Sequence, residues 1–323
     1  MKALPLPITN IVAVRNDRFG EFLLNIPAFR ALKETFPDAR LSVVVNSGIR
    51  DLAARVPYID SCIVWENTPH SWTQTWKFAR SLKQGRYDMC VILNPQREFN
   101  IISRIAGIPV RVGYRRKWPW LLTHTMPDEK HLGQRHEIDY NLELVGLVGA
   151  KTQDKSLSLA LSQDLPRGFP WKPDSTFLCL HPWTSDPRKQ WPVTRFQELA
   201  RRLRRELGID IAVIGGIGER ESAKDFFYHF GSDLLDLVGK ITLVECAIVL
   251  QRARLLVSGD SGPMHLAAAV GTPTVALFRD DIPAKGPRRW GPWGQGHAVI
   301  AKPSLNAITV DAVFYKVKEL MSR

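Results

Sequence analysis

Several features are scarce in this sequence, and each scarcity excludes a class of protein. The 323 residues include four cysteines, which are too few and too far apart for a disulfide framework or a cysteine-rich metal site. We expect Cys62, Cys90, Cys179 and Cys246 to be reduced thiols, three of them in buried strands. Every apolar run is interrupted before it reaches the roughly 20 residues that a membrane-spanning helix needs. The sequence therefore predicts a globular protein.

The amino-terminal segment also lacks the features of a targeting sequence. MKALPLPITNIVAVRND has one lysine and two prolines before a short β-rich run, which is unlike the apolar core of a signal peptide. No low-complexity tract or short internal repeat is evident. Because 45% of the residues are hydrophobic and 24% are charged, we expect a folded cytoplasmic protein.

Length and periodicity together predict two domains. A chain of 323 residues is long for a single core and suits two domains of ordinary size. Strand-like runs alternate with helical segments over residues 1–161 and again over 176–323, which indicates parallel sheets with right-handed crossovers. Residues 162–175 contain three prolines and no clear period, so we expect a linker there. The predicted fold class is α/β, with two Rossmann-like, doubly wound domains.

The expected elements follow from the apolar pattern. In the first domain we expect strands over 8–14, 41–45, 62–65, 87–93 and 111–114, and helices over 22–35, 48–55, 72–84, 97–106 and 134–148. Pro27 is expected to kink the first of these helices. In the second domain we expect strands over 177–180, 210–214, 234–238, 254–257, 274–278 and 297–301, and helices over 194–207, 219–230, 243–252, 264–270 and 309–321. Residues 279–296 are rich in Pro and Gly and are expected to form an irregular loop.

The most informative stretch is 257–278, VSGDSGPMHLAAAVGTPTVALF. It predicts a strand, a glycine-rich turn, a short helix opened by Pro263, and a second buried strand. A capped core helix would explain the glycines alone. The backbone N–H groups of the first turn also favour an anion, however, and Asp260 or Ser261 can cap the helix. We therefore predict a phosphate or diphosphate site at the end of a parallel strand, formed by Asp260, Ser261, Gly262 and His265.

The sequence lacks two motifs that would indicate a dinucleotide cofactor or a catalytic metal. Residues 211–219, IAVIGGIGE, begin like a dinucleotide-binding turn, but Glu221 occupies the third glycine position, so the oxidoreductase fingerprint fails. The chain also has no Asp-x-Asp triplet, the carboxylate pair that many metal-dependent transferases use. The anion site predicted above rests on a helix N-terminus and needs no such pair, so we expect no metal and no cofactor.

The string DSGPMHLAAAVGTPTVALF closely resembles the signature of glycosyltransferase family 9, which includes the ADP-heptose:lipopolysaccharide heptosyltransferases. The resemblance implies the GT-B architecture, in which two Rossmann-like domains face each other across a cleft. It implies that the first domain binds the acceptor and the second binds the nucleotide sugar, with residues 162–175 as the hinge. In this arrangement the last helix either stays with the second domain or packs back on the first.

Three motifs resemble functional segments of that family. RNDRFGE after the first strand resembles a signature in which a Gly-Asp pair carries the general base; here the pair is Gly20-Glu21, so Glu21 or Asp17 is implied. A carboxylate that merely stabilises a helix N-terminus is the simpler alternative for Glu21. TSDPRKQWP resembles a phosphate-binding loop, and IGGIGE resembles a ribose-binding turn. The residues implied by these two motifs are Thr184, Ser185, Lys189 and Glu219, with Glu221 as the second choice for the ribose.

The resemblance implies an inverting, metal-independent transfer of a sugar, with ADP-heptose as donor and the lipopolysaccharide inner core as acceptor. Two alternatives have the same sequence features. A nucleotide-sugar 2-epimerase shares the architecture and needs no acceptor. A non-catalytic nucleotide-binding or membrane-docking protein is compatible with glutamate in place of the family's aspartate.

The net charge of +12 favours an anionic partner. Basic and aromatic residues alternate in one cluster, formed by Arg111, Arg115, Arg116, Lys117, Trp118, Tyr114 and Trp120. Such a cluster can rest on an anionic membrane or bind a phosphorylated glycolipid, stack on nucleic acid, or form a solvated loop. With the family resemblance we expect Arg115, Arg116, Lys117 and Trp118 to face the acceptor or the inner membrane's cytoplasmic face, and no nucleic acid partner. The basic run 201–205 is expected to be the solvated face of a helix.

Overall fold

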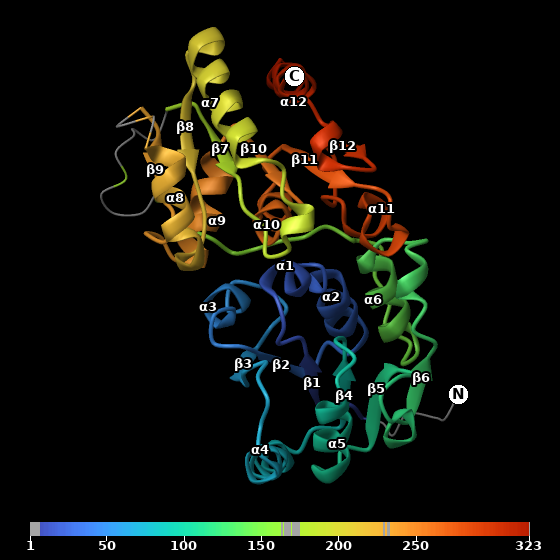
Figure 1. Cartoon of the computed structure of the whole chain (residues 1–323). Helices are drawn as coiled ribbons and strands as arrows, with labels where there is room; N and C mark the ends of the chain where they lie inside the picture. Colours follow the sequence, from blue (N-terminus) through green and yellow to red (C-terminus); the bar gives the residue numbers. More distant parts are fainter. Residues whose placement is uncertain are drawn as a thin grey trace. The chain divides into compact units, whose positions relative to one another are not determined.

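The first of the two units into which the chain divides, Met1–Ala160, is built on a six-stranded sheet of order β3-β2-β1-β4-β5-β6 (Figure 1). The computed structural model describes residues 7–162, 164, 169, 175–228, 230 and 233–322. The strands are β1 Asn10–Val14, β2 Arg40–Val45, β3 Ser61–Val64, β4 Met89–Ile92, β5 Val110–Tyr114 and β6 His124–Met126. All neighbouring strands pair in parallel. The order is that of a doubly wound fold, which places its switch point between β1 and β4.

The helices of the first unit are α1 Phe19–Leu23, α2 Ile26–Thr35, α3 Arg50–Ala53, α4 Trp72–Gln84, α5 Arg97–Ile105 and α6 Glu137–Gly146, with short 3-10 turns η1 Pro119–Leu121 and η2 Lys130–Leu132. The prediction of one kinked helix over 22–35 is wrong. Two helices occupy this stretch, and Pro27 lies in the first turn of α2, where its missing N–H costs nothing. The Asn25 side chain donates to the Glu21 carbonyl (2.6 Å), which helps to hold the break between them.

The second unit, Leu161–Arg323, repeats the arrangement with the order β12-β11-β10-β7-β8-β9. Its strands are β7 Phe177–His181, β8 Asp210–Val213, β9 Leu235–Asp236, β10 Leu255–Gly259, β11 Thr274–Arg279 and β12 Ala298–Lys302. Its helices are α7 Val193–Leu207, α8 Arg220–Phe227, α9 Leu243–Arg252, α10 Gly262–Ala269, α11 Pro287–Trp290 and α12 Val310–Met321, with turns η3 Pro187–Lys189, η4 Ile217–Glu219, η5 Pro283–Lys285 and η6 Leu305–Ala307. The switch point lies between β7 and β10. The predicted α/β class with two Rossmann-like domains is confirmed.

Apolar side chains from both faces of each sheet make the cores. In the second unit, α12 buries Val313, Phe314 and Val317 in the same cluster as β7, β8 and β10, so the apolar face of the last helix is covered within its own unit. Residues 279–296 are more regular than predicted, because they contain η5 and α11. Most of the predicted linker, 162–175, lies outside the described residues.

All four cysteines are free, as expected. Cys62, Cys90 and Cys179 lie in β3, β4 and β7, and Cys246 lies in α9. Burial raises the pKa of the Cys90 thiol to about 12, which keeps it protonated. Cys90 and Cys179 are therefore packing residues, whereas Cys62 and Cys246 are only partly buried.

Candidate active site

The turn between β10 and α10 is built around a close approach of two loops. A Cβ at Gly259 would lie 3.2 Å from the carbonyl oxygen of Lys189 and 3.2 Å from Cγ2 of Thr184. Glycine therefore suits the close approach of the 184–190 loop to the end of β10, since a side chain there would push the loop away by a few tenths of an ångström. This contact brings two predicted phosphate-binding segments, 71 residues apart in sequence, to one edge of the sheet.

Trp191, two residues after Lys189, anchors the loop that carries this lysine. Trp191 is fully buried, its indole N–H donates to the Ile308 carbonyl (3.0 Å), and its ring packs edge-on against Phe196. Lys189 lies in η3 just before this anchor, and its Nζ forms an ion pair with Oδ2 of Asp260. The Lys189 side chain is 20% exposed and that of Asp260 is 9% exposed, so the cation is held at the rim of the site.

The N-terminus of α10 is not capped as predicted. Ser261 is the N-cap residue, but its side chain makes no capping hydrogen bond. Its hydroxyl lies 2.8 Å from the Ser258 hydroxyl and 3.1 Å from Nδ1 of His181. The N-cap side chain therefore does not satisfy the first-turn N–H groups, and these groups together with Lys189 suit an anion.

His181 is a buried polar residue of this candidate site that the sequence analysis missed. It ends β7, is buried, and holds both serine hydroxyls of the turn through Nδ1. Burial lowers its pKa to about 4, so the imidazole is neutral at physiological pH. The sequence signal that could have identified His181 is a polar residue at the end of a predicted central strand.

We expect His181→Asn to flatten the pH dependence of stability. The pKa of His181 is lowered from 6.5 to about 4 in the folded chain, so the unfolded chain binds the proton more strongly. Stability due to neutral His181 is then present above pH 6.5 and is lost as pH falls toward 4, by about 3 kcal/mol. Denaturant unfolding at several pH values measures this slope, and an identical slope in the variant would contradict the assignment.

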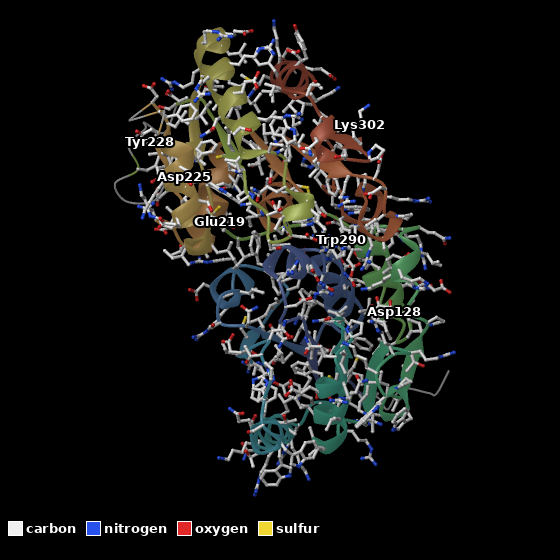
Figure 2. All side chains as sticks on the ribbon, viewed as in Figure 1. Asp128, Glu219, Asp225, Tyr228, Trp290 and Lys302 are labelled. Carbon is white, nitrogen blue, oxygen red and sulfur yellow. The ribbon has the colours of Figure 1, made fainter. Side chains whose placement is uncertain are left out.

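The other predicted donor residues lie around the same edge. Thr184 donates its hydroxyl to the Asp186 carbonyl (2.8 Å), and Ser185 is exposed. Glu219 accepts the Gly216 N–H and closes η4, and burial raises its pKa; Figure 2 shows it at the start of α8. Glu221 instead forms an exposed ion pair with Lys224. His265 is buried within α10, with its ring edge-on to Trp290 at 6.4 Å.

In the first unit, a buried arginine organises the predicted base. Arg15 directly follows β1, and its side chain is 3% exposed. Its guanidinium forms ion pairs with Asp17 (2.8 Å) and Glu21 (2.5 Å), lies 3.9 Å from Glu137, and donates to the Leu93 carbonyl (3.1 Å). Burial works against the charge of Arg15, but the three carboxylates outweigh burial and raise its pKa. Both candidate bases, Asp17 and Glu21, therefore form ion pairs with the same guanidinium group.

The carboxyl group of Glu21 has an unusual protonation equilibrium. Burial raises its pKa, Arg15 opposes the rise, and Asp17 adds to it through its charge and a shared hydrogen bond, so that the pKa of Glu21 is about 7. Its side chain is 27% exposed, whereas that of Asp17 is 13% exposed. A partly accessible carboxylate with a pKa near the working pH has the properties of a general base.

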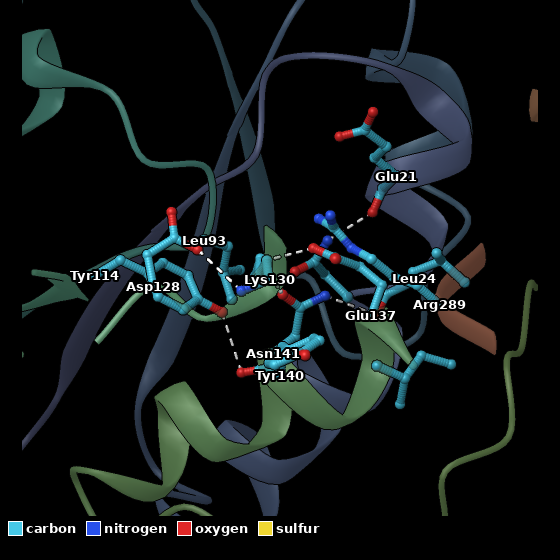
Figure 3. A network of polar contacts seen from close by, with 12 residues as sticks. Glu21, Leu24, Leu93, Tyr114, Asp128, Lys130, Glu137, Tyr140, Asn141 and Arg289 are labelled. Carbon is cyan, nitrogen blue, oxygen red and sulfur yellow. Dashed lines mark hydrogen bonds and ion pairs between the residues drawn. The ribbon is translucent and has the colours of Figure 1, made fainter. Parts of the chain in front are cut away.

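A second buried cation, Lys130 of η2, contacts Glu137 and Asn141 of α6 beside this group. Nζ of Lys130 lies 2.5 Å from Glu137 and 3.3 Å from the Asn141 side-chain oxygen (Figure 3), and Asn141 donates to the Leu24 carbonyl (3.2 Å). Glu137 is 1% exposed. The network therefore ties α6 to the turn that follows α1.

Replacing Lys130 by Met is expected to lower the free energy of unfolding by about 3–5 kcal/mol, because Glu137 would lose a buried partner. The matched control is Arg116→Met, since Arg116 is 59% exposed and pairs with Asp128 at 3.0 Å; its loss should cost less than about 1 kcal/mol. Urea titrations of both variants measure the difference. Equal losses would contradict the burial argument.

Comparison with known proteins assigns the chain to a family. The family model for glycosyltransferase family 9 (heptosyltransferase) matches residues 75–312. The chain belongs to glycosyltransferase family 9. The recognition and the predicted GT-B fold are thus confirmed, and the protein is a glycosyltransferase.

Individual relatives are distant but cover nearly the whole chain. The glycosyltransferase is 24% identical to lipopolysaccharide heptosyltransferase 2 of Escherichia coli K12 over 84% of this chain and 83% of the relative. The solved structure of E. coli ADP-heptose lps heptosyltransferase II superposes with a TM-score of 0.83 at 22% identity, covering 97% of this chain and 99% of that one. A family 9 structure from Veillonella parvula gives a TM-score of 0.86 at 20% identity, covering 97% of each. At these identities the structures show the shared fold.

The basic cluster of the glycosyltransferase follows β5. Arg115, Arg116, Lys117 and Trp118 are all exposed.

In the described ranges, no group of three or more His, Cys, Asp or Glu residues could hold a metal ion. None of the helices in those ranges has both the length and the apolarity needed to cross a bilayer.

Arg15, Lys130 and Glu137 were also missed by the sequence analysis. Arg15 had the same signal as His181, because it is a polar residue at the end of the central strand of its sheet. The sequence contains no comparable signal for Lys130 and Glu137, because their contacts with residues near β1 form only in the folded domain.

Proposed function

We propose that this glycosyltransferase transfers heptose from ADP-heptose to a hydroxyl of the lipopolysaccharide inner core, with inversion at the anomeric carbon and without a metal. The observation that carries the proposal is the Glu21 carboxyl group, whose pKa is about 7 beside Arg15. The relatives named as lipopolysaccharide heptosyltransferases support the choice of donor and acceptor.

In the proposed reaction, Glu21 accepts the proton of the acceptor hydroxyl as its oxygen attacks the anomeric carbon. The bond from that carbon to the diphosphate oxygen breaks, and ADP leaves with the electron pair. Glu21 is preferred to Asp17 because it is the more exposed of the two carboxylates. Arg15 orients the base and stabilises its ionised form until the proton moves.

The proposed donor site is in the second unit. Lys189 and the first-turn N–H groups of α10 receive the diphosphate, and Thr184 and Ser185 lie on the same loop. Asp260 is proposed to position Lys189 through their ion pair, and Glu219 to contact the ribose. No step in this scheme needs a metal, because the leaving charge is met by a lysine and a helix N-terminus.

Residues 1–161 are proposed to bind the acceptor and residues 176–323 the donor, with 162–175 as the hinge. The acceptor is an anionic glycolipid, which suits a net charge of +12. We place the reaction at the cytoplasmic face of the inner membrane, where Arg115, Arg116, Lys117 and Trp118 would meet the acceptor or the lipid.

Calorimetric binding of ADP, GDP, UDP and CDP, each with and without EDTA, tests the donor assignment. We expect a preference for ADP that EDTA does not change and that Asp260→Ala weakens. Arg205→Gln, on the exposed face of α7, serves as a control that removes a charge elsewhere in the same unit. Tight UDP binding, or loss of ADP binding in EDTA, would contradict the proposal.

A further inference from the structure

We propose that α4, α5 and η1 of the first unit form a docking surface for the anionic face of a phospholipid bilayer. The four exposed tryptophans among the described residues all lie on or beside these elements. Trp72 is 63% exposed, Trp76 45%, Trp118 42% and Trp120 71%. Large indole rings left in water are unusual, and tryptophan favours the boundary between the apolar and polar regions of a membrane. We call this set, with Lys77, Arg80 and Arg97, the tryptophan surface.

Contacts place the three elements of this surface next to one another. Trp72 and Trp76 lie one turn apart on α4, and Arg80 stacks over Trp76 at 5.4 Å. Beside Trp76, Thr75 donates its hydroxyl to Glu98 (2.9 Å), which joins the first turns of α4 and α5.

From α5 the contacts continue to η1. Arg97 stacks over Trp118 at 5.1 Å, and Trp118 stacks on Trp120 with centroids 5.7 Å apart. Figure 1 shows α4 and α5 side by side at one end of this unit. The exposed aromatic rings and cations therefore lie on three adjacent elements.

The charge of this surface is predominantly positive. Helix α4 carries Lys77, Arg80 and Lys83 and no carboxylate, and residues 109–127 carry four basic residues, of which Arg116 pairs with Asp128. The one acidic residue of α5, Glu98, is turned toward Thr75 and His70. Arginine and lysine can extend past the rings to lipid phosphates while the indoles lie at headgroup level.

The backbone is strained at Lys117 and Trp118, in the segment that carries the exposed rings of Trp118 and Trp120. Lys117 and Trp118 have φ values of 53° and 70°, which is unfavourable for residues with a side chain. The Asn100 side chain holds the strained segment by donating to the Lys117 carbonyl (2.8 Å). Strain maintained at an exposed aromatic site indicates a function other than packing.

An anionic bilayer fits this surface. Its indole rings suit the headgroup region, and its lysine and arginine side chains are attracted by anionic lipids. The inference deepens the proposed function, because a membrane-borne acceptor requires an enzyme that reaches the membrane. Binding to lipid can nevertheless be measured without donor or acceptor.

Flotation of the full chain with vesicles tests the surface. We expect binding to vesicles of phosphatidylglycerol mixed with phosphatidylcholine, weaker binding to phosphatidylcholine alone, and release by salt. Trp72→Ala combined with Trp76→Ala should reduce binding at least about tenfold. Lys77→Gln combined with Arg80→Gln should reduce it by about fivefold for each cation.

The matched control combines Tyr315→Ala and Arg205→Gln in the second unit, which removes a similarly exposed aromatic ring and one cation. It should bind vesicles within about twofold of wild type, since each surface cation away from the membrane contributes little. Transfer to a delipidated acceptor should be unchanged in both the tryptophan and the control variants. Vesicle binding without transfer in wild type would refute the proposed function and leave the docking surface standing.

Three results would overturn the docking surface. They are absence of vesicle binding by wild type, wild-type binding by the tryptophan variant, and equal binding to both vesicle types. Self-association that the tryptophan substitutions abolish, seen by light scattering without any vesicle binding, would assign the surface to a second copy of the chain instead.

Discussion

Replacing Glu21 by Gln is expected to lower kcat by about 10²- to 10⁴-fold, the usual contribution of a general base. The substitution keeps the shape and removes the proton acceptor, while Arg15 retains Asp17 and Glu137 as partners. Glu34→Gln, at an exposed position of α2, makes the same chemical change away from the site and should leave kcat unchanged. Steady-state kinetics with saturating donor measure both.

The pH profile separates catalysis from structure. Because only the ionised carboxylate accepts a proton, kcat should rise with pH through about 7, the pKa of Glu21. Asp17→Asn removes a like charge from Glu21, so its pKa should fall and this rise should move to lower pH. A profile that Asp17→Asn leaves in place, or an active Glu21→Gln variant, would remove Glu21 from the mechanism.

Replacing Lys189 by Ala should reduce kcat/KM by about 10²- to 10³-fold, since one group that stabilises developing charge contributes about 3–4 kcal/mol. The substitution has two effects. It removes a cation from the diphosphate site, and it leaves Asp260, 9% exposed, without this ion-pair partner. The negative charge of Asp260, no longer paired with Lys189, would repel the phosphates.

The double variant Lys189→Ala with Asp260→Ala distinguishes these effects, because residues in one ion pair do not act additively. We expect the double variant to lose less activity than the sum of the two single losses. Arg188→Ala is the neighbouring control, since Arg188 pairs with Asp186 and its side chain is 66% exposed. Equal losses for Lys189 and Arg188 would mean that the loop acts only through its net charge.

Local signals predicted some elements to the residue. Helix α4 spans 72–84 and α9 spans 243–252, as expected. Both begin at a capping box, Ser71 with Gln74 and Thr242 with Glu245, in which the cap and its partner are three residues apart. Such boundaries are encoded within one turn of chain and need no tertiary information.

Elements that depend on distant partners were not predicted. The three-residue strand β6 exists because it pairs with β5, and its sequence, HTM, has no strand pattern of its own. The division between α1 and α2 is supported by Asn141 of α6, which donates to Leu24. Neither feature can be read from the local sequence.

In the candidate site, too, some features follow from local sequence motifs and others depend on distant residues. Lys189 and Asp260 lie in short motifs whose residue types suggested their chemistry, and the fold brings them together. The orientation of Ser261 depends on His181, 80 residues away. The raised pKa of Glu21 depends first on burial and then on Arg15 and Asp17, so its value could not be obtained from sequence spacing.

Transfer measured in the presence of EDTA tests the central claim most directly. The full chain would be incubated with ADP-heptose and a delipidated inner-core acceptor at pH values on both sides of 7, and the new linkage determined by NMR. The account predicts transfer with an inverted anomeric configuration, at a rate that rises through about pH 7 in wild type and is lost in Glu21→Gln. Retention of configuration, loss of transfer in EDTA, or isomerisation of a UDP-sugar without an acceptor would contradict it.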